Sequence, residues 1–398
     1  MRRTELDAGQ RHSSTAGQPT NRLAVPPSSR QAVRPLICAL LLALVTAPAV
    51  RAQGGVLVQG IADGEGWFTN NSSNLLTRNG GRPAGLLRLD LWGAAEPVRG
   101  LVFYAEGTGE SGPAGSERTT TTTLWGKQLG VRYATTPAFV VDVGKMTPVI
   151  GSFAPRHFST RNPLIGTPDG YTLQYPVGAK VSGRVGMFDY RVAMVSLPTT
   201  HVGYEPEPSP RLRPAVGGGI TPIVGLRLGG SFTAGSYLNK DDSLSLPAGT
   251  SWSDFHQRVA AFDASYARGY LETHVEAARG TYELPARGSI TGFTYYGEVK
   301  YTFTPRFFLA GRAERNDYPF IRAATTVSGT YAGRLTDFVD GEIGGGYRVS
   351  TTALLKVSVR GDRWWVKPGG GFKGQGGHAI ALQLSQAFDL TGLIDRHE

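Results

Sequence analysis

The chain is poor in cysteine, in charge and in long apolar runs. It has one Cys in 398 residues, and Asp, Glu, Lys and Arg make up 18% of it, below the roughly one quarter of an average protein. Its only long apolar run, residues 36–45, is too short to cross a bilayer as a helix, which takes about 20 residues. Because Cys38 lies inside that run, disulfides and Cys-based zinc or haem sites are excluded from everything that follows it.

Glycine, proline and aromatic residues are abundant instead. The 54 Gly and 25 Pro disfavour a helical protein, because these are the two poorest helix formers. The 16 Tyr, 17 Phe and 6 Trp disfavour disorder, since they supply many large rings to bury. Many short strands joined by turns are the remaining expectation.

The apolar run has the features of a secretory signal peptide. Arg30 and Arg34 precede it, and small residues between Ala49 and Ala52 offer cleavage sites. We therefore predict that residues 1–52 are a signal peptide, whose long polar start indicates a true start codon further downstream. Without this leader the chain has 34 basic and 29 acidic residues, a net charge of +5 instead of +10. The high net charge is therefore no indication of nucleic-acid binding.

Beyond the leader, segments of about ten residues alternate apolar and polar side chains. One clear case sets Leu87, Leu89 and Leu91 against Arg88 and Asp90. Alternation with period two is typical of a strand with one apolar and one polar face. Sixteen such segments can be counted, starting near residues 55, 85, 98, 122, 138, 177, 189, 213, 223, 255, 269, 291, 305, 334, 352 and 377.

The breaks between these segments alternate strictly between short and long. Eight are long, and seven are tight, at 95–97, 136–137, 188–189, 221–222, 268–269, 304–305 and 350–351. Outer-membrane barrels have this pattern, with short periplasmic turns and long external loops. The sequence thus predicts an all-β protein, a 16-stranded antiparallel transmembrane barrel over residues 53–388, in the outer membrane of a diderm bacterium. Residues 389–398 would form a periplasmic tail.

The last predicted strand carries a further signal. Ile380, Leu382, Leu384 and Phe388 share one parity, which resembles the C-terminal signal that the barrel-assembly machinery reads. Outer-membrane lipids and this machinery are therefore expected partners, although ten residues follow Phe388 here.

Three phrases resemble the sixteen-stranded porins, most of all the phosphate-selective porin O/P type. They are Val143-Gly144-Lys145 followed by Pro148, the run 264–270 over a short turn, and Tyr301-Thr302-Phe303-Thr304-Pro305-Arg306. The resemblance implies a homotrimer that conducts small hydrophilic solutes or anions passively, without a cofactor, past arginines and lysines. It also implies that the third external loop folds into the lumen.

The third long break, residues 147–176, suits such a constriction loop. Its four Pro before residue 170 and its several apolar residues indicate a segment packed against a wall instead of an exposed loop. The charged and titratable residues in and beside it are our candidates for the pore constriction: Lys145, Arg156, His157, Arg161 and Asp169. Arginines and a histidine at this point would give a mild preference for anions, including phosphate-like ones.

Charges on the polar strand faces fall into two groups. A basic wall comprises Arg132, Lys180, Arg184, Arg191 and Arg227, and an acidic wall comprises Glu272, Glu276, Glu298, Glu314, Asp340 and Glu342. Walls of opposite sign would set up a field across a narrow pore.

Two other functions remain open at this point. The barrel could be a scaffold that sheathes a partner such as a cytochrome, or, with less support, an outer-membrane lipase. An inward-folded third loop favours a solute pore, whereas a loop outside the barrel favours the sheath. A lipase needs a His on the lipid face, and parity places His274 inside. No motif of a metal site or of an enzyme is present, so we expect a non-enzymatic protein.

Overall fold

The structure is a computed structural model that describes residues 55–70, 76, 78–113, 119–168, 175–196, 211–237, 246–284, 288–317, 336–366 and 375–391. The predicted signal peptide, Asp169 and most of the C-terminal tail lie outside these residues.

Sixteen strands make up most of the described chain. Their bounds are β1 Val56–Thr69, β2 Ala84–Val98, β3 Leu101–Pro113, β4 Thr120–Thr136, β5 Phe139–Lys145, β6 Val177–Val185, β7 Phe188–Val195, β8 Arg213–Ile223, β9 Leu226–Ser236, β10 His256–Arg268, β11 Leu271–Leu284, β12 Gly288–Thr304, β13 Phe307–Asp317, β14 Thr336–Arg348, β15 Ala353–Val366 and β16 Gln375–Asp389. The described helices are three 3₁₀ turns, η1 Asn79–Gly81, η2 Ala154–Arg156 and η3 Trp252–Asp254. None of the described helices is long and apolar enough to cross a membrane.

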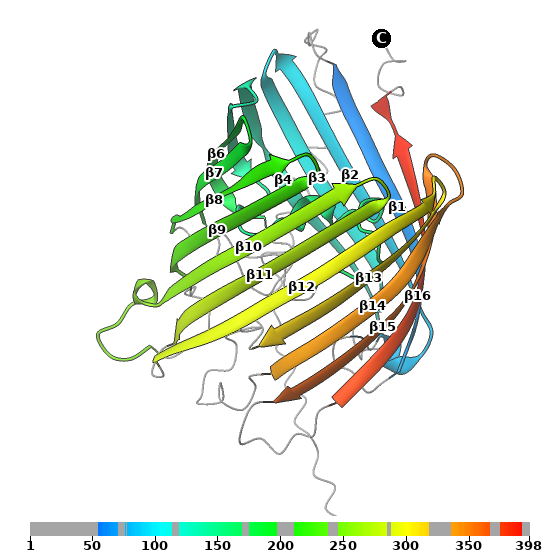
Figure 1. The fold of residues 1–398 in the computed structure, drawn as a ribbon. Helices are drawn as coiled ribbons and strands as arrows, with labels where there is room; N and C mark the ends of the chain where they lie inside the picture. Colours follow the sequence, from blue (N-terminus) through cyan, green and yellow to red (C-terminus); the bar gives the residue numbers. More distant parts are fainter. Residues whose placement is uncertain are drawn as a thin grey trace, which may run out of the picture. The chain divides into compact units, whose positions relative to one another are not determined.

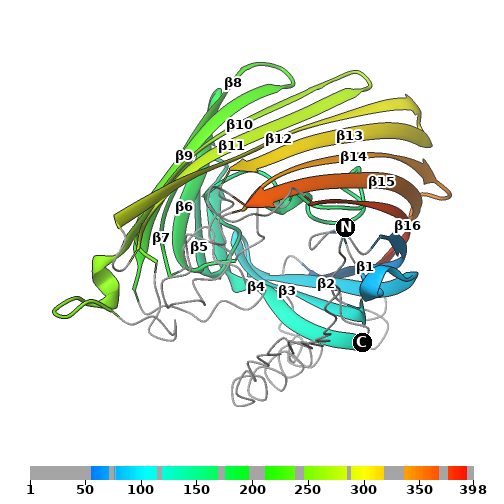
Figure 2. The ribbon, with the colours of Figure 1, turned by 90° about the horizontal axis from the view of Figure 1, so that it is seen from below.

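Each strand pairs antiparallel with its neighbours in sequence, and β1 pairs with β16 to close the barrel (Figures 1 and 2). Closure gives every strand two partners, so the sheet has no open edge. Gly60 on β1 lies opposite Phe388 on β16, whose ring covers it. Phe388 thus packs at the seam of the barrel, the contact between β1 and β16 where the sheet closes. The predicted sixteen-stranded antiparallel fold is confirmed.

All sixteen strand starts lie within three residues of the predicted positions, but three of the seven tight breaks were placed wrongly. The two-residue turns lie at 99–100, 137–138, 186–187, 224–225, 269–270 and 305–306, and a longer one at 349–352. The predicted breaks at 95–97 and 221–222 lie within β2 and β8, where the register shifts. Proline removes a ladder hydrogen bond, yet a bulge lets the strand continue past it. The break at 188–189 is the start of β7, and Gly186 makes the turn at a φ of 57°.

The two faces of the wall differ in polarity as the alternation predicts. On β15, Leu355, Val357 and Val359 are 45–55% exposed on the outside, while Lys356 and Arg360 are at most 7% exposed inside. The outer face is apolar and the inner face is polar, which is the reverse of the polarity in a water-soluble protein. Lipid requires the apolar face to point outward. The polar interior is where a functional site has to be sought.

Candidate functional site

The segment that joins β5 to β6, which we call loop 146–176, is described at residues 146–168 and 175–176, and these residues lie inside the barrel. Its apolar side chains pack on wall sectors that are far apart around the ring. Val149 packs with Ala193 and Ala215 of β7 and β8, and Ile150 packs with Val259 and Tyr282 of β10 and β11. Ile165 contacts the other side of the ring, with Trp67, Ala379 and Ala381 of β1 and β16. A loop outside a closed barrel could not contact all of these strands.

Inward carboxylates of the far wall hold the loop backbone. The Glu276 carboxylate accepts hydrogen bonds from the Ser152 amide at 3.0 Å and from the Tyr296 hydroxyl at 2.9 Å. The Glu342 carboxylate accepts from the amides of Ile165 and Gly166 at 3.1 and 3.0 Å. Both carboxylates are fully buried, so each compensates amides that the loop could not otherwise satisfy.

Arg156 ties the same stretch of loop to β12. Its guanidinium forms an ion pair with Glu298, which also pairs with Arg312 at 3.4 Å. Glu298 is 1% exposed at its side chain and Arg156 16%. Arg156 therefore supports the loop from within and offers little free charge to a passing ion.

Lys356 on β15 is a fully buried cation of the site. Its side-chain ammonium donates to three loop carbonyls, those of Ser159 at 2.9 Å, Asn162 at 3.1 Å and Leu164 at 3.0 Å. The residue is 1% exposed. Three donors meeting three acceptors fix the position of residues 159–164 against the wall.

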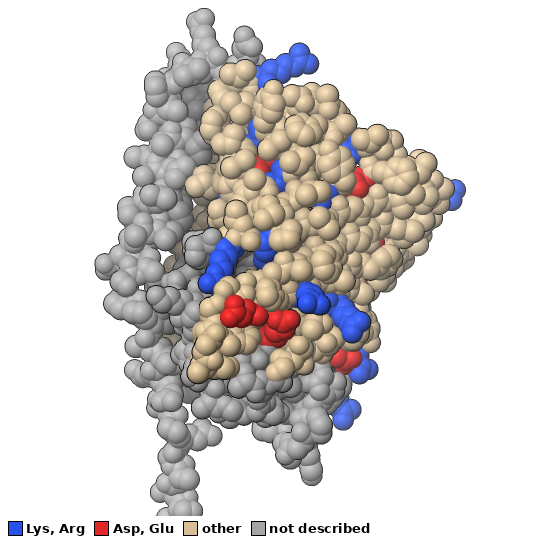
Figure 3. Space-filling model, turned by 90° about the vertical axis from the view of Figure 1, so that its left-hand side faces the viewer, with Lys and Arg blue, Asp and Glu red and all other residues tan. Residues whose placement is uncertain are grey.

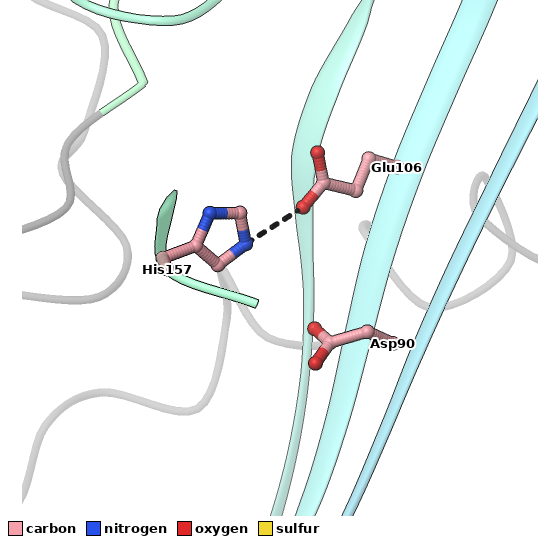
Figure 4. Close-up of side chains that lie close together, drawn as sticks. All are labelled: Asp90, Glu106 and His157. Atoms are coloured by element: carbon pink, nitrogen blue, oxygen red, sulfur yellow. Dashed lines mark ion pairs between the residues drawn. The ribbon is translucent and has the colours of Figure 1, made fainter. Parts of the chain in front are cut away.

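The loop also contributes His157 to a buried polar cluster on β2 and β3 (Figure 4). His157 Nε2 lies 3.2 Å from a carboxylate oxygen of Glu106, and Nδ1 lies 2.6 Å from the Ala154 carbonyl oxygen. Asp90 lies beside them and is bonded to the Lys127 ammonium at 2.7 Å. The His157 ring therefore lies between the backbone of its own loop and the Glu106 carboxylate on the wall.

The same cluster is the one group of the described residues whose ligand atoms could surround a metal ion. Single ligand atoms of Asp90, Glu106 and His157 lie within 4.8 Å of one another. However, the Lys127 ammonium already lies between the two carboxylates, 2.7 Å from Asp90 and 3.7 Å from Glu106. A divalent cation would have to displace this ammonium, so the cluster is better suited to holding the loop.

Burial and the nearby carboxylates of Glu106 and Asp90 raise the pKa of the loop phenol Tyr175, which stays neutral.

The inward side chains of β4 to β9 leave more charge accessible. Arg132 is 49% exposed at its side chain and Arg227 25%, and Arg184 is also exposed. Arg132 pairs with Asp142 at 2.7 Å, and Arg227 pairs with Asp189 at 2.7 Å. These arginines belong to the predicted basic wall, which also includes Lys180 and Arg191. Of these, Lys180 is buried beside Asp142, and Arg191 donates to the Gly151 carbonyl of the loop at 3.4 Å.

The predicted acidic wall is largely occupied by internal ion pairs. Arg312 pairs with both Glu298 and Glu342, and Arg360 pairs with Asp340 at 2.8 Å. Glu314 accepts from Asn316 at 2.6 Å. Only Glu272, paired with Lys300 at 2.6 Å, keeps a side chain as much as 41% exposed. The accessible lumen charge therefore lies mainly on the basic wall.

The structure brings most of the predicted constriction residues together, but not all of them. Arg156, His157 and Arg161 lie on the inward-folded loop, and Arg161 is exposed. Lys145 shares its register position with Leu129 and Val177, both exposed on the outer face, and it donates to the Gly126 carbonyl. Asp169 lies outside the described residues.

Sequence parity missed several inward charges. Lys127 turns inward because a register shift between Glu106 and Gly107 leaves it as the extra residue of a bulge in β4. Asp189 was assigned to a tight turn and so was not counted, although it shares the inward face of β7 with Arg191. The bulge has no clear sequence signal, whereas the Gly186 turn could have indicated Asp189.

Comparisons with known proteins identify the fold. No family model and no curated protein matches the chain. Among solved structures, the anion-selective porin from Comamonas acidovorans matches with a TM-score of 0.56 at 12% identity, over 84% of this chain and 100% of that one. OmpF from Salmonella typhi matches with a TM-score of 0.54 at 10% identity, over 85% and 99%. A mutant of OmpT that lacks loop L8, from the outer membrane of Vibrio cholerae, matches with a TM-score of 0.52 at 10% identity, over 84% and 99%.

The chain therefore has the sixteen-stranded barrel fold of the bacterial porins. The likeness extends over the whole barrel and does not single out the phosphate-selective type.

Proposed function

We propose that this protein is an outer-membrane porin through which small hydrophilic solutes and ions diffuse passively. The observation that carries this proposal is loop 146–176, which lies inside a closed barrel and is bonded to β12, β14 and β15. An inward loop narrows a lumen without filling it as a partner protein would. The fold of the neighbours supports an outer-membrane location, and we extend their class to a homotrimer on the same ground.

Selectivity in this proposal comes from the accessible arginines. Arg161 on the loop and Arg184 on β6 are exposed, and neither forms an ion pair with an acidic residue among the described residues. Most other lumen charges are paired, so these two contribute most of the unbalanced field. The expected result is a mild preference for anions, and phosphate-like anions are the class to test first.

The test is the reversal potential of single channels in a planar bilayer under a salt gradient. We compare wild type with the double variant Arg161→Glu/Arg184→Glu, and with Arg306→Glu on a short turn as the matched control. A unit charge about 8 Å from an ion in water contributes about 0.5 kcal/mol. Two charge reversals, halved by screening at about 0.1 M salt, change the ion's energy by about 1 kcal/mol. The chloride-to-potassium permeability ratio should therefore fall about fivefold or more, with the control unchanged.

Three outcomes are informative. The expected fall supports both the pore and its selectivity residues. Open channels with an unchanged ratio would keep the porin and remove Arg161 and Arg184 from its selectivity. A correctly folded barrel that never conducts would overturn the porin and favour the sheath. Repeating the recording with a phosphate salt tests the finer specificity.

Neither alternative function gains support from the site. A sheath for a cytochrome is favoured by a third loop outside the barrel, and loop 146–176 is bonded within it. His274, the histidine that the sequence offered for a lipase, lies opposite Glu298 and Ser265 on the inward face.

A further inference from the structure

Arginines on the outer face of the barrel form a pattern that conduction does not use. By register, Arg258 on β10, Arg279 on β11 and Arg315 on β13 share the outward face with Phe262, Val275 and Leu309. Arg258 and Arg279 are exposed, and the Arg315 side chain is 44% exposed. An arginine on the lipid-facing side is costly at the bilayer midplane but nearly free at its edges.

The height of these arginines on the wall places them at one edge of the bilayer. Arg258 is ten residues from the turn-side end of β10, Arg268, and Arg279 is eight residues from Leu271. At about 3.3 Å per residue and a tilt of about 45°, they lie about 23 and 19 Å above the short turns. The apolar band of such barrels is about 25 Å tall. Both therefore lie at the boundary nearest the long loops, which in a porin is the outer leaflet.

Figure 3 shows one side of the barrel, which is mostly tan, with a band of blue and red groups across the middle of the described surface.

The two arginines are neighbours with polar and aromatic support. Arg279 pairs in register with Ala260, so Arg258 is its diagonal neighbour, about 7–8 Å away. The Arg279 guanidinium lies 5.6 Å from the centre of the Phe293 ring, which holds it along the wall. Opposite Arg258, the hydroxyls of Thr281 and Thr291 lie 3.2 Å apart. The result is a cradle of two cations and two hydroxyls.

Nearby acids on the same face have other partners. Glu283 is engaged by His256 at 3.2 Å, and Asp317 by Arg315 at 3.0 Å. Neither Arg258 nor Arg279 forms an ion pair with an acidic residue in the described part of the chain. Two unpaired guanidinium groups at the lipid boundary therefore face the headgroups, and phosphate is the group that guanidinium binds best there.

We propose that Arg258 and Arg279, with Thr281 and Thr291, bind the phosphate of a lipid headgroup in the outer leaflet. The acyl chains of that lipid would lie on the apolar wall below, beside Phe293 and Tyr295, which are 47% and 45% exposed. This inference rests on the proposed outer-membrane porin for its orientation.

The experiment measures lipid binding to the full barrel in a neutral detergent. The probes are diphosphorylated lipid A, its form without phosphates, and inorganic phosphate. The double variant Arg258→Gln/Arg279→Gln is compared with wild type and with Arg268→Gln, an outward arginine at the turn end of β10. Heat-modifiable gel mobility confirms that each barrel is folded.

We expect the double variant to bind diphosphorylated lipid A about 30-fold more weakly, equivalent to about 2 kcal/mol. Arg268→Gln should stay within about twofold of wild type, and the phosphate-free form should bind all three proteins equally weakly. Equal affinity of the double variant and wild type would overturn the proposal. Displacement of the lipid by inorganic phosphate would also overturn it, because the site would then belong to a free anion.

The binding measurement does not depend on conduction. A barrel that binds the phosphorylated lipid through these arginines but never conducts would overturn the porin and leave the lipid site standing. A double variant that conducts like wild type and keeps its lipid affinity would overturn the lipid site alone.

Discussion

Replacing Lys356 by Met should release part of loop 146–176 from the wall. The side chain is buried, and its ammonium donates to three carbonyls of residues 159–164 at 2.9 to 3.1 Å. Methionine has a similar length and no donor, so the change removes all three hydrogen bonds with little change of volume. The backbone hydrogen bonds between β15 and its neighbouring strands stay intact, because Lys356 contributes to them only through its backbone.

The expected size of the effect follows from the carbonyls left behind. A buried acceptor without a donor costs about 1–3 kcal/mol, so three of them cost about 3–9 kcal/mol if nothing relaxes. Burying the ammonium carries a desolvation penalty of its own, which the variant no longer has. We therefore take the lower end, and docking of residues 159–164 should weaken by about 3 kcal/mol, or about 150-fold. Contacts of Glu276 and Glu342 with the loop should keep it inside the barrel.

Single-channel recording and limited proteolysis together check this prediction. Lys356→Met should show larger current noise and faster cleavage within 146–176 than wild type. Lys300→Met is the matched control, because Lys300 is a lumen lysine that pairs with Glu272 on the wall. If Lys356→Met conducts as quietly as wild type and resists protease equally, then Lys356 does not hold the loop. Heat-modifiable mobility separates that result from a barrel that failed to fold.

Two glycine substitutions extend the same reasoning. Gly166→Ala should loosen the loop much as Lys356→Met does, since the added Cβ would meet the Glu342 carboxylate at 2.5 Å and Arg360 at 2.7 Å. The control is Gly64→Ala, whose Cβ has only Leu87 within 4 Å, at 3.9 Å. Equal current noise in the two variants would contradict the role of Gly166 in holding the loop. Gly60→Val should lower the yield of refolded barrel by disturbing the seam, because the new side chain overlaps the Phe388 ring, at a cost of about 1–3 kcal/mol. Gly66→Val, with no atom within 4 Å of its Cβ, should refold like wild type, and matching yields for Gly60→Val would refute a tightly packed seam.

The strands were predictable because lipid imposes a simple rule on them. One face must be apolar and the other faces the lumen, so alternation along β15 marks both the strand and its inward residues, Lys356 and Arg360. Turn positions were less predictable where proline lies in a strand, as at Pro97 and Pro222, because a bulge carries the strand past it. The same limit applies to Lys127, whose inward position depends on a bulge instead of on parity.

Loop 146–176 was predictable as an inward segment, from its prolines and apolar residues and from the porin resemblance. Its partners were not. Ser152 bonds to Glu276, 124 residues away, and the Ser159 carbonyl bonds to Lys356, 197 residues away. Which inward side chains meet the loop depends on the stagger between strands and on where β1 meets β16, and neither leaves a local signal in the sequence.

The charges illustrate the division most clearly. Sequence alone determined that bases gather on the inward faces of β4 to β9 and acids on those of β10 to β14. Only the tertiary structure decided which of them remain accessible, because closure pairs Arg312 with Glu298 and Glu342 and the loop covers Lys356. A charge counts toward a pore's field only when it is unpaired and near water, and both conditions are set by neighbours that the fold brings together.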